Sequence, residues 1–368
     1  MIPVNEPKIG DLEFKYVMDA LNSGWISSGG KYIDRFEKQF SNLIGKKFAI
    51  SVSNGTAALE TALHGMGVGE GDEVIMPSFT IISCAIAAIR LGAKPVLVDI
   101  EPITWNMNPY LLEEKITKKT KVVMPVHIFG HAVDMDPILE LQKKYNFKIL
   151  EDTAESHGAE YKNRKCGSMG DCSTFSFYAN KLITTGEGGM VLTDNKDIFE
   201  KCVKYKNLYF SNDERFRHDD LGHNFRMTNL QAAIGCGQVE RFEEILKFKI
   251  KMGELYREYL EEIEGIRFQE QMSWAKSVYW MYSVELSPDL GIDADTARTR
   301  LLKEGIETRP FFRGLHSQPA LKRLGLFEGE DFPNTEFAYK YGFYLPSGMT
   351  LQPKQVKFVT DKLRKIIR

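Results

Sequence analysis

Residues 173–193 read STFSFYANKLITTGEGGMVLT, in which two apolar segments are joined by a glycine-rich connection. Ser173–Tyr178 and Gly189–Thr193 are short and rich in β-branched and aromatic residues, so we expect two adjacent strands. Lys181 follows the first strand and precedes the glycines. Lysines usually lie in solvent, but glycines let a bound ring approach the backbone closely. A buried lysine here has a lowered pKa, which makes its amine a nucleophile toward carbonyl groups.

Short apolar strands and helical patterns alternate on the N-terminal side of this stretch. The expected strands are Phe48–Ser53, Glu73–Met76, Pro95–Asp99, Lys121–Val126 and Lys148–Glu151. The expected helices are Leu12–Leu21, Tyr32–Leu43, Thr56–Met66, Phe79–Leu91, Tyr110–Ile116 and Ile138–Tyr145. This alternation predicts a parallel sheet with right-handed crossovers. Because the strands are almost continuously apolar, we expect both faces of the sheet to be covered.

The C-terminal third has a different pattern. Long helices are expected from Thr228 to about Ile263. The elements expected after them are the strands Val278–Leu286 and Glu307–Phe312 and the helices Ala294–Glu304 and Lys354–Ile367. We therefore expect a large α/β domain over residues 1–245 and a smaller α+β domain over residues 246–368.

Composition and charge narrow the class of protein. The 368 residues are 43% hydrophobic and 27% charged, which is ordinary for a globular protein. A formal net charge of −2 gives no general attraction to nucleic acid or membrane. The longest apolar segment, Phe79–Ile89, is too short to span a bilayer. We expect a cytoplasmic protein, since the first residues lack a signal-peptide pattern and the odd count of five cysteines argues against a disulfide framework.

Two further segments place polar residues at the carboxyl ends of expected strands, where open α/β sheets bind their ligands. Ser53–Thr56 opens a helix, whose free N–H groups and partial positive charge suit a phosphate. Plain helix capping by Ser, Asn or Thr explains the same residues. Asp152 follows the strand Lys148–Glu151 and could hold a pyridine nitrogen protonated. A helix cap or a metal carboxylate is the alternative, but the neighbouring Glu155 and His157 match no metal-ligand spacing, so no metal is expected.

The combination is more specific than its parts. A phosphate cradle, a strand-end aspartate and a downstream strand-end lysine, in this order, describe the fold-type I enzymes that use pyridoxal 5′-phosphate. Ser176 lies on the strand before Lys181 and could offer its hydroxyl to the phosphate. A dinucleotide-binding loop is excluded here, because GxGxxG is absent and the glycine run does not open a βαβ unit.

Over essentially its whole length the chain resembles the DegT/DnrJ/StrS sugar aminotransferases. The matching stretches are Gly24–Gly29, Ser53–Thr56, Gly71–Val74, Phe129–His131, Glu151–Glu155, Thr184–Met190 and Asn224–Met227. Members that act on GDP-linked sugars look similar at Trp25–Ser28, Asn180-Lys181, Arg226–Asn229 and Glu307–Pro310. The resemblance implies a fold-type I enzyme whose large domain holds a mixed, mostly parallel seven-stranded sheet between helices. It also implies a homodimer with shared active sites.

The resemblance carries a role to each matching position. The implied catalytic residues are Lys181, as the Schiff-base lysine, and Asp152, as the partner of the pyridine nitrogen. The implied cofactor contacts are Gly55, Thr56 and Ser176 at the phosphate, Glu155 near the phenolic oxygen, and Asn224 reaching the phosphate of the other protomer. The implied contacts of the sugar nucleotide are Trp25, Ser27, Arg309 and His316.

One position departs from the family pattern. Many members stack an aromatic residue on the cofactor, just after the threonine of a Pro-Ser-x-Thr segment. Here Pro77–Thr80 is followed by Ile81, which covers the ring without the offset-stacking contribution of about 0.5–1.5 kcal/mol. Lys181 agrees with amino transfer, because a relative with histidine at this position performs a dehydration instead.

The expected reaction moves the amino group of glutamate to the 4-keto carbon of a nucleotide-linked 4-keto-6-deoxy sugar, with GDP-4-keto-6-deoxymannose as the first choice. Lys181 would carry the proton in both halves of a ping-pong cycle. UDP- or dTDP-linked sugars and amination at carbon 3 are alternatives within the same class. Cofactor-dependent dehydration and a non-enzymatic regulatory or scaffold role are alternatives outside it.

Overall fold

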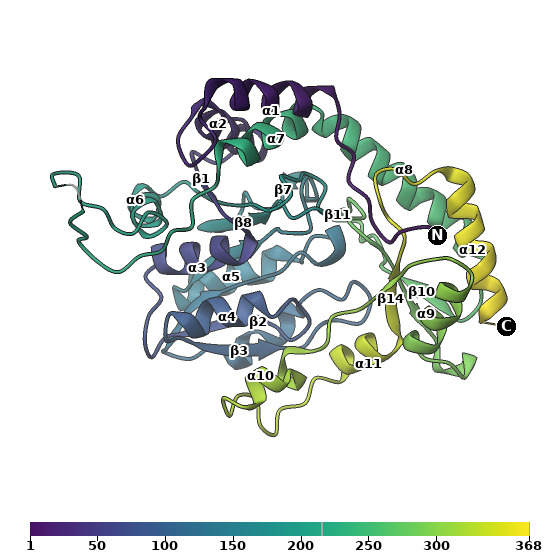
Figure 1. The fold of residues 1–368 in the computed structure, drawn as a ribbon. Helices are drawn as coiled ribbons and strands as arrows, with labels where there is room; N and C mark the ends of the chain where they lie inside the picture. The colour runs from purple at the N-terminus through teal and green to yellow at the C-terminus, as the bar shows by residue number, and fades with distance from the viewer. Residues whose placement is uncertain (215, 368) are drawn as a thin grey trace.

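The computed structural model describes residues 1–214 and 216–367. Two helices open the chain, α1 (Asp11–Ser23) and α2 (Lys31–Ile44), and both pack against α7 (Asn229–Glu240), as Figure 1 shows at one end of the molecule. Each of the two expected N-terminal helices is confirmed, with one or two more residues at each end. Thr228 begins α7 by accepting a hydrogen bond from the Gln231 N–H at 3.2 Å, which satisfies one of the donors that a helix start leaves free.

The central sheet has seven strands in the order β1-β9-β8-β5-β4-β2-β3. Its strands are β1 (Phe48–Val52), β2 (Glu73–Pro77), β3 (Lys94–Val98), β4 (Thr120–Val123), β5 (Lys148–Asp152), β8 (Cys172–Ser176) and β9 (Gly189–Thr193). β9 is antiparallel to β1 and β8, and the other pairs are parallel. Because β9 is antiparallel to both β1 and β8, β1 runs in the same direction as β8 and β5. The carboxyl ends of β1, β5 and β8 therefore lie at the same edge of the sheet. The expected mixed, mostly parallel seven-stranded sheet is confirmed.

Helices cover both faces of this sheet, as its apolar strands predict. Along β9, Met190 and Leu192 pack in one core with residues of α2 and α7, whereas Val191 packs in the other core with residues of α3. The helices that accompany the central sheet are α3 (Gly55–Gly65), α4 (Ser83–Arg90), α5 (Met135–Tyr145) and α6 (Lys196–Tyr205).

The C-terminal part has a sheet and a core of its own (Figure 1). Its antiparallel strands are, in spatial order, β10 (Ile266–Phe268), β12 (Tyr282–Leu286), β14 (Gly342–Leu345) and β13 (Arg309–Pro310). Its helices are α8 (Phe242–Leu260), α9 (Ala294–Lys303), α10 (Pro319–Lys322), α11 (Pro333–Tyr341) and α12 (Pro353–Ile366). A small third sheet joins β11 (Ala275–Lys276), β6 (Glu160–Tyr161) and β7 (Arg164–Lys165). α8 runs through the boundary expected between residues 245 and 246, and that division stays a prediction.

Three expected elements are at least four residues shorter than the sequence pattern suggests. The helix expected at Phe79–Leu91 begins only at Ser83, because the Ser78 N–H still bonds the Val98 carbonyl at 2.8 Å and keeps the chain extended past β2. The strands expected at Val278–Leu286 and Glu307–Phe312 reduce to β12 and β13. After the second, the Phe311 N–H still bonds the Gly342 carbonyl of β14 at 3.2 Å, and the buried Phe311 ring packs against Trp105 and Phe129.

The helix expected at Tyr110–Ile116 was wrong. Two three-residue 3₁₀ turns stand there, Pro109–Leu111 and Glu113–Lys115. A single deeply buried residue between them, Leu112, anchors the segment, and one apolar contact does not make the stripe that an α-helix needs. Within the described residues, none of the helices combines the length and the apolar composition that crossing a bilayer requires.

Candidate active site

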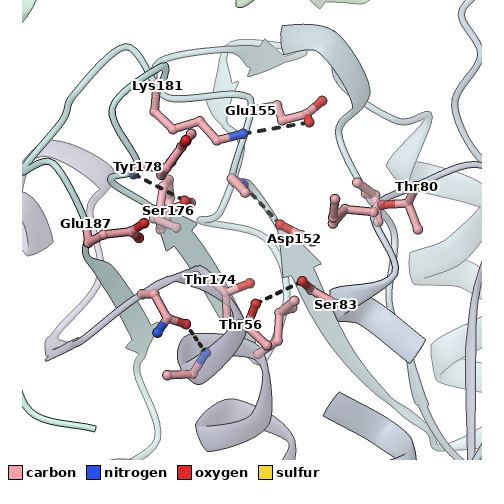
Figure 2. Close-up of a pocket in the computed structure, with 18 of the residues that line it drawn as sticks. Thr56, Thr80, Ser83, Asp152, Glu155, Thr174, Ser176, Tyr178, Lys181 and Glu187 are labelled. Carbon is pink, nitrogen blue, oxygen red and sulfur yellow. Dashed lines mark hydrogen bonds and ion pairs between the residues drawn. The ribbon is translucent and has the colours of Figure 1, made fainter. Parts of the chain in front are cut away.

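A cavity of about 660 Å³ opens at the edge where β1, β5 and β8 end. Figure 2 shows side chains from these strand ends and from the starts of α3 and α4 converging on it. Seven of the residues predicted from sequence line this cavity, namely Gly55, Thr56, Ile81, Asp152, Glu155, Ser176 and Lys181. The expectation that ligands bind at the carboxyl ends of the strands therefore correctly placed segments more than 100 residues apart in the chain at one cavity.

Lys181 lies in the turn after β8, where its backbone N–H bonds the Tyr178 carbonyl at 2.9 Å. Its side chain is only 10% exposed, and its Nζ lies 3.7 Å from Glu155 Oε1 (Figure 2). Burial lowers the pKa of Lys181, although the charges of Glu155 and Asp152 oppose that shift. A lysine with a lowered pKa is deprotonated more readily, which is what attack on an aldehyde requires.

Asp152 ends β5 and is 2% exposed. Its Oδ1 accepts the Ala154 N–H at 3.0 Å, and its Oδ2 accepts the Cys84 thiol at 3.3 Å. Burial raises the pKa of Asp152, and the Ala154 N–H, Cys84 and Lys181 work against that rise. A thiol is a weak donor, so Oδ2 keeps the capacity to bind a cationic ring nitrogen. Such a partner would offset the cost of burying the carboxylate.

The cavity floor at the start of α3 suits a phosphate. The Asn54 side chain caps the helix by accepting the Ala57 N–H at 2.8 Å, and Gly55 and Thr56 supply the first helical residues. A Cβ on Gly55 would lie 2.9 Å from the Ser176 Cβ, so only glycine lets α3 approach β8 this closely. The Thr56 and Ser83 hydroxyls bond each other at 2.8 Å (Figure 2).

These donor sets fit pyridoxal 5′-phosphate. A helix start with hydroxyls can hold the phosphate, a buried aspartate can hold the ring nitrogen, and a buried lysine can reach the aldehyde. Ile81 lines the cavity and is 45% exposed, as a residue that covers a bound ring should be.

Glu155 gives the site a pH-dependent stability. Its Oε2 accepts the Phe129 N–H at 2.8 Å, yet burial raises its pKa to about 7, against the opposing charge of Lys181. Between pH 4.5 and about 7 the folded chain keeps a proton that the unfolded chain releases, so stability falls as pH rises. In wild-type protein stripped of cofactor, we expect the free energy of unfolding to fall by about 3 kcal/mol across this window, and in Glu155→Gln we expect this fall to be absent. Urea unfolding of both proteins at a series of pH values measures this difference. Parallel plots of unfolding free energy against pH would show that Glu155 is not the group that titrates.

A buried network beside the cavity supports β5. Glu151 is fully buried, and its carboxylate accepts three backbone N–H groups, from Gly167, Met169 and Gly170, at 2.6–2.7 Å. It also accepts His127 Nε2 at 3.1 Å. Burial alone would raise the pKa of Glu151, but the His127 and backbone bonds hold it below its usual value.

We expect Glu151→Gln to cost about 3 kcal/mol of unfolding free energy, because the new amide turns a donor toward backbone donors. Chemical denaturation checks this. The matched control is Glu262→Gln, an exposed position on the same chain, which should change stability by less than about 0.5 kcal/mol. Equal effects of the two substitutions would show that the network does not stabilise the fold.

Several cavity residues were missed by the sequence analysis. Ser83 lines the cavity at the start of α4, and the next residue, Cys84, is buried behind it against Asp152. Both follow the end of β2, so the rule that ligands bind at strand ends points to this segment. The helix expected from Phe79 hid that signal. Trp280 and Tyr344 line the cavity from the C-terminal part, and no local pattern marks either residue.

Five predicted contacts lie outside this cavity in the single chain. Trp25 and Asn224 are exposed, and Arg309 forms an ion pair with Glu307 at 2.9 Å. Ser27 contributes its backbone carbonyl, which accepts the N–H of Asn229 at 2.6 Å. The fifth, His316, lines a second cavity. Its Nε2 lies 3.1 Å from Glu336. Their roles toward a sugar nucleotide or a second protomer stay predictions.

With this geometry established, comparison with known proteins decides the family. The profile of the DegT/DnrJ/EryC1/StrS aminotransferase family matches residues 7–364. The chain belongs to this family. The expected class of enzyme, an aminotransferase, is confirmed.

Relatives and solved structures of the family cover nearly the whole chain. GDP-perosamine synthase from Vibrio cholerae is 40% identical over 99% of this chain and 98% of its own length. GDP-perosamine synthase from Caulobacter vibrioides is 39% identical over 100% of this chain and 98% of its own. Spr1654 from Streptococcus pneumoniae, solved in a PLP form, is 26% identical with a TM-score of 0.91, covering 100% of this chain and 98% of that one. The fold expected from the resemblance is confirmed.

Proposed function

We propose that this aminotransferase moves the amino group of glutamate to the 4-keto carbon of GDP-4-keto-6-deoxymannose and forms GDP-perosamine. The observation that carries the chemistry is the buried amine of Lys181, which faces Glu155 and Asp152 at the strand-end cavity. The identity of the substrate is supported by the full-length relatives named GDP-perosamine synthase.

Each residue has a task in this proposal. Pyridoxal phosphate, when bound, supplies a ring that accepts electrons from the carbon being deprotonated. The Asp152 carboxylate holds the proton on the ring nitrogen, and Thr56 and Ser176 orient the phosphate. Lys181 would hold the cofactor through Nζ, and its free amine would take the proton from the donor's α-carbon. The same amine returns a proton in the second half-reaction, at carbon 4 of the sugar.

Part of the cavity lining is apolar. Phe312, from the C-terminal part, and Ile81, after β2, contribute to it, together with the ring of Tyr344. Apolar walls suit the methyl group of a 6-deoxy sugar and keep water from a reactive carbon.

We propose that the active form is a homodimer. Phe14, Met18 and Leu21 follow helical spacing on α1, and all three are at least 47% exposed. Trp25, two residues beyond the helix end, is also exposed. Contiguous exposed apolar side chains of this kind indicate a protein interface. In such a dimer, Asn224 of one protomer would reach the cofactor phosphate of the other. Light scattering of the purified protein gives its molecular mass, which distinguishes a dimer from a monomer.

We also propose a cytoplasmic location. The five cysteines are all free and buried in the structure, which agrees with a reducing compartment.

The test is a panel of GDP-, UDP- and dTDP-linked 4-keto-6-deoxy sugars, each incubated with protein, cofactor and glutamate. Mass spectrometry should find the 4-amino product and 2-oxoglutarate with the GDP sugar at the highest rate. A preference for a UDP or dTDP sugar would keep the reaction and overturn the substrate. A dehydrated product would favour the dehydratase alternative, and absence of glutamate consumption with every sugar would favour a regulatory role.

A further inference from the structure

Trp280 contacts the peptide and the side chain of the active-site lysine. It lies just before β12, is 3% exposed, and lines the strand-end cavity. Its indole Nε1–H donates to the Asn180 carbonyl at 2.8 Å. The Lys181 Nζ lies 3.7 Å from the centre of a Trp280 ring. A ring face at this distance attracts an ammonium group.

The Asn180 carbonyl is held from two distant parts of the chain. Asn5 Nδ2 donates to it at 3.3 Å, in addition to Trp280. The peptide between Asn180 and Lys181 lies in a turn, where its N–H bonds the Tyr178 carbonyl, and these two side chains satisfy its carbonyl. A lysine side chain has many rotamers, and fixing its peptide narrows the positions that Nζ can reach.

Trp280 is itself firmly placed. Its carbonyl accepts the Nζ of Lys249 at 2.8 Å, and the same amine donates to the Ser347 carbonyl at 2.6 Å. The indole stacks with Phe129 at 6.4 Å between ring centres and an interplanar angle of 17°. Phe129 in turn donates its N–H to Glu155, the carboxylate that faces Lys181. One packed unit therefore sets the positions of both the amine and the carboxylate.

We propose that Trp280 is a positioning residue for Lys181: its indole N–H fixes the peptide before the lysine, and its ring face receives the ε-ammonium group. The inference deepens the proposed function and rests on it. The titratable groups that face Lys181 in the structure are Glu155, Asp152 and His157. The two carboxyl groups favour the ammonium form of Lys181, whereas burial disfavours it. The face of the indole ring also favours the ammonium form.

The two contributions of Trp280 can be separated by substitution. Trp280→Phe keeps a ring face and loses the N–H donor, whereas Trp280→Leu loses both. The matched control is Trp105→Phe, because Trp105 is 1% exposed and its Nε1–H donates to Glu285 at 3.1 Å outside the cavity. Like Trp280→Phe, Trp105→Phe loses a buried indole hydrogen bond, so both variants should lose similar thermal stability. Trp105→Phe should not change the reactivity of Lys181.

The experiment follows the binding of pyridoxal phosphate to the full-length chain stripped of cofactor. Stopped-flow visible absorbance gives the rate of reaction with Lys181, and its dependence on pH gives the midpoint at which the amine becomes reactive. We expect both Trp280 variants to react about tenfold more slowly than wild type. Only Trp280→Leu should also move the midpoint to lower pH, because the ammonium form loses its ring. Trp105→Phe should keep the wild-type rate and midpoint.

Wild-type rates and midpoints in both Trp280 variants would overturn the inference. So would equal slowing in Trp105→Phe, which would show a structural effect only. If Trp280→Leu fails to fold, Trp280→Phe still decides through its rate. If wild-type protein itself forms no visible band, the proposed function fails, and that outcome is distinct from a failure of the role of Trp280.

Discussion

Replacement of Lys181 with alanine is expected to lower amino transfer by at least about 10⁴-fold, because the proposed nucleophile and proton carrier are lost together. The structure leaves no substitute within the described residues that line the cavity: Lys181 is the only lysine among them, and Arg90 is fixed to Glu60 at 3.3 Å. Product formation from glutamate and the keto sugar, followed by mass spectrometry, measures the loss. The visible band of the loaded protein should disappear with it.

The control for Lys181→Ala is Lys46→Ala. Lys46 is also buried, with its amine bonded to the Gly170 carbonyl at 2.8 Å and to Asp194 at 3.1 Å, and it lies outside the cavity. Its loss should reduce stability while turnover per folded molecule stays within about twofold of wild type. Full turnover by Lys181→Ala would overturn the assignment, and equal loss in both variants would show that burial of a lysine, not its position, is being measured.

The residues at strand ends could be predicted because short apolar segments, alternating with helical patterns, show where the strands lie. Asp152 follows four residues of β5, and an acid at that edge suggests a ligand contact, a helix cap or a metal ligand. Lys181 was found because a lysine follows an apolar strand and precedes a glycine-rich turn. Gly55 was found because a helix start beside a strand end suits phosphate. These inferences need only local sequence and the direction of a parallel sheet.

Other features depend on packing between distant segments, and no local pattern encodes them. The bond from Trp280 to Asn180 spans 100 positions in the chain. Cys84 binds Asp152 across 68 positions, and alanine would satisfy the same helical pattern. The helix expected at Tyr110–Ile116 failed for the same reason, since its conformation is decided by where Leu112 is buried.

Asp152→Asn is expected to lower the rate of amino transfer by about 10³-fold or more while the cofactor still binds. Asparagine has nearly the same shape, and its oxygen can still accept the Ala154 N–H. It carries no charge, however, so the nitrogen of a bound ring would lose the anion that keeps its proton, and the ring would accept electrons poorly. The substitution also removes a buried carboxylate whose pKa burial has raised, so the stripped protein should become more stable, not less, near neutral pH.

Opposite directions of activity and stability make Asp152→Asn a sharp test. Its matched control is Asp99→Asn, since Asp99 is a buried carboxylate outside the cavity that accepts the N–H groups of Ile100, Asn334 and Thr335 at 2.9–3.1 Å. There the amide places a donor against donors, so stability should fall while turnover per folded molecule is kept. Single-turnover kinetics with glutamate and urea unfolding of the stripped proteins give both quantities. If Asp152→Asn lost stability and kept its rate, Asp152 would be a structural carboxylate like Asp99, and the ring nitrogen would need another partner.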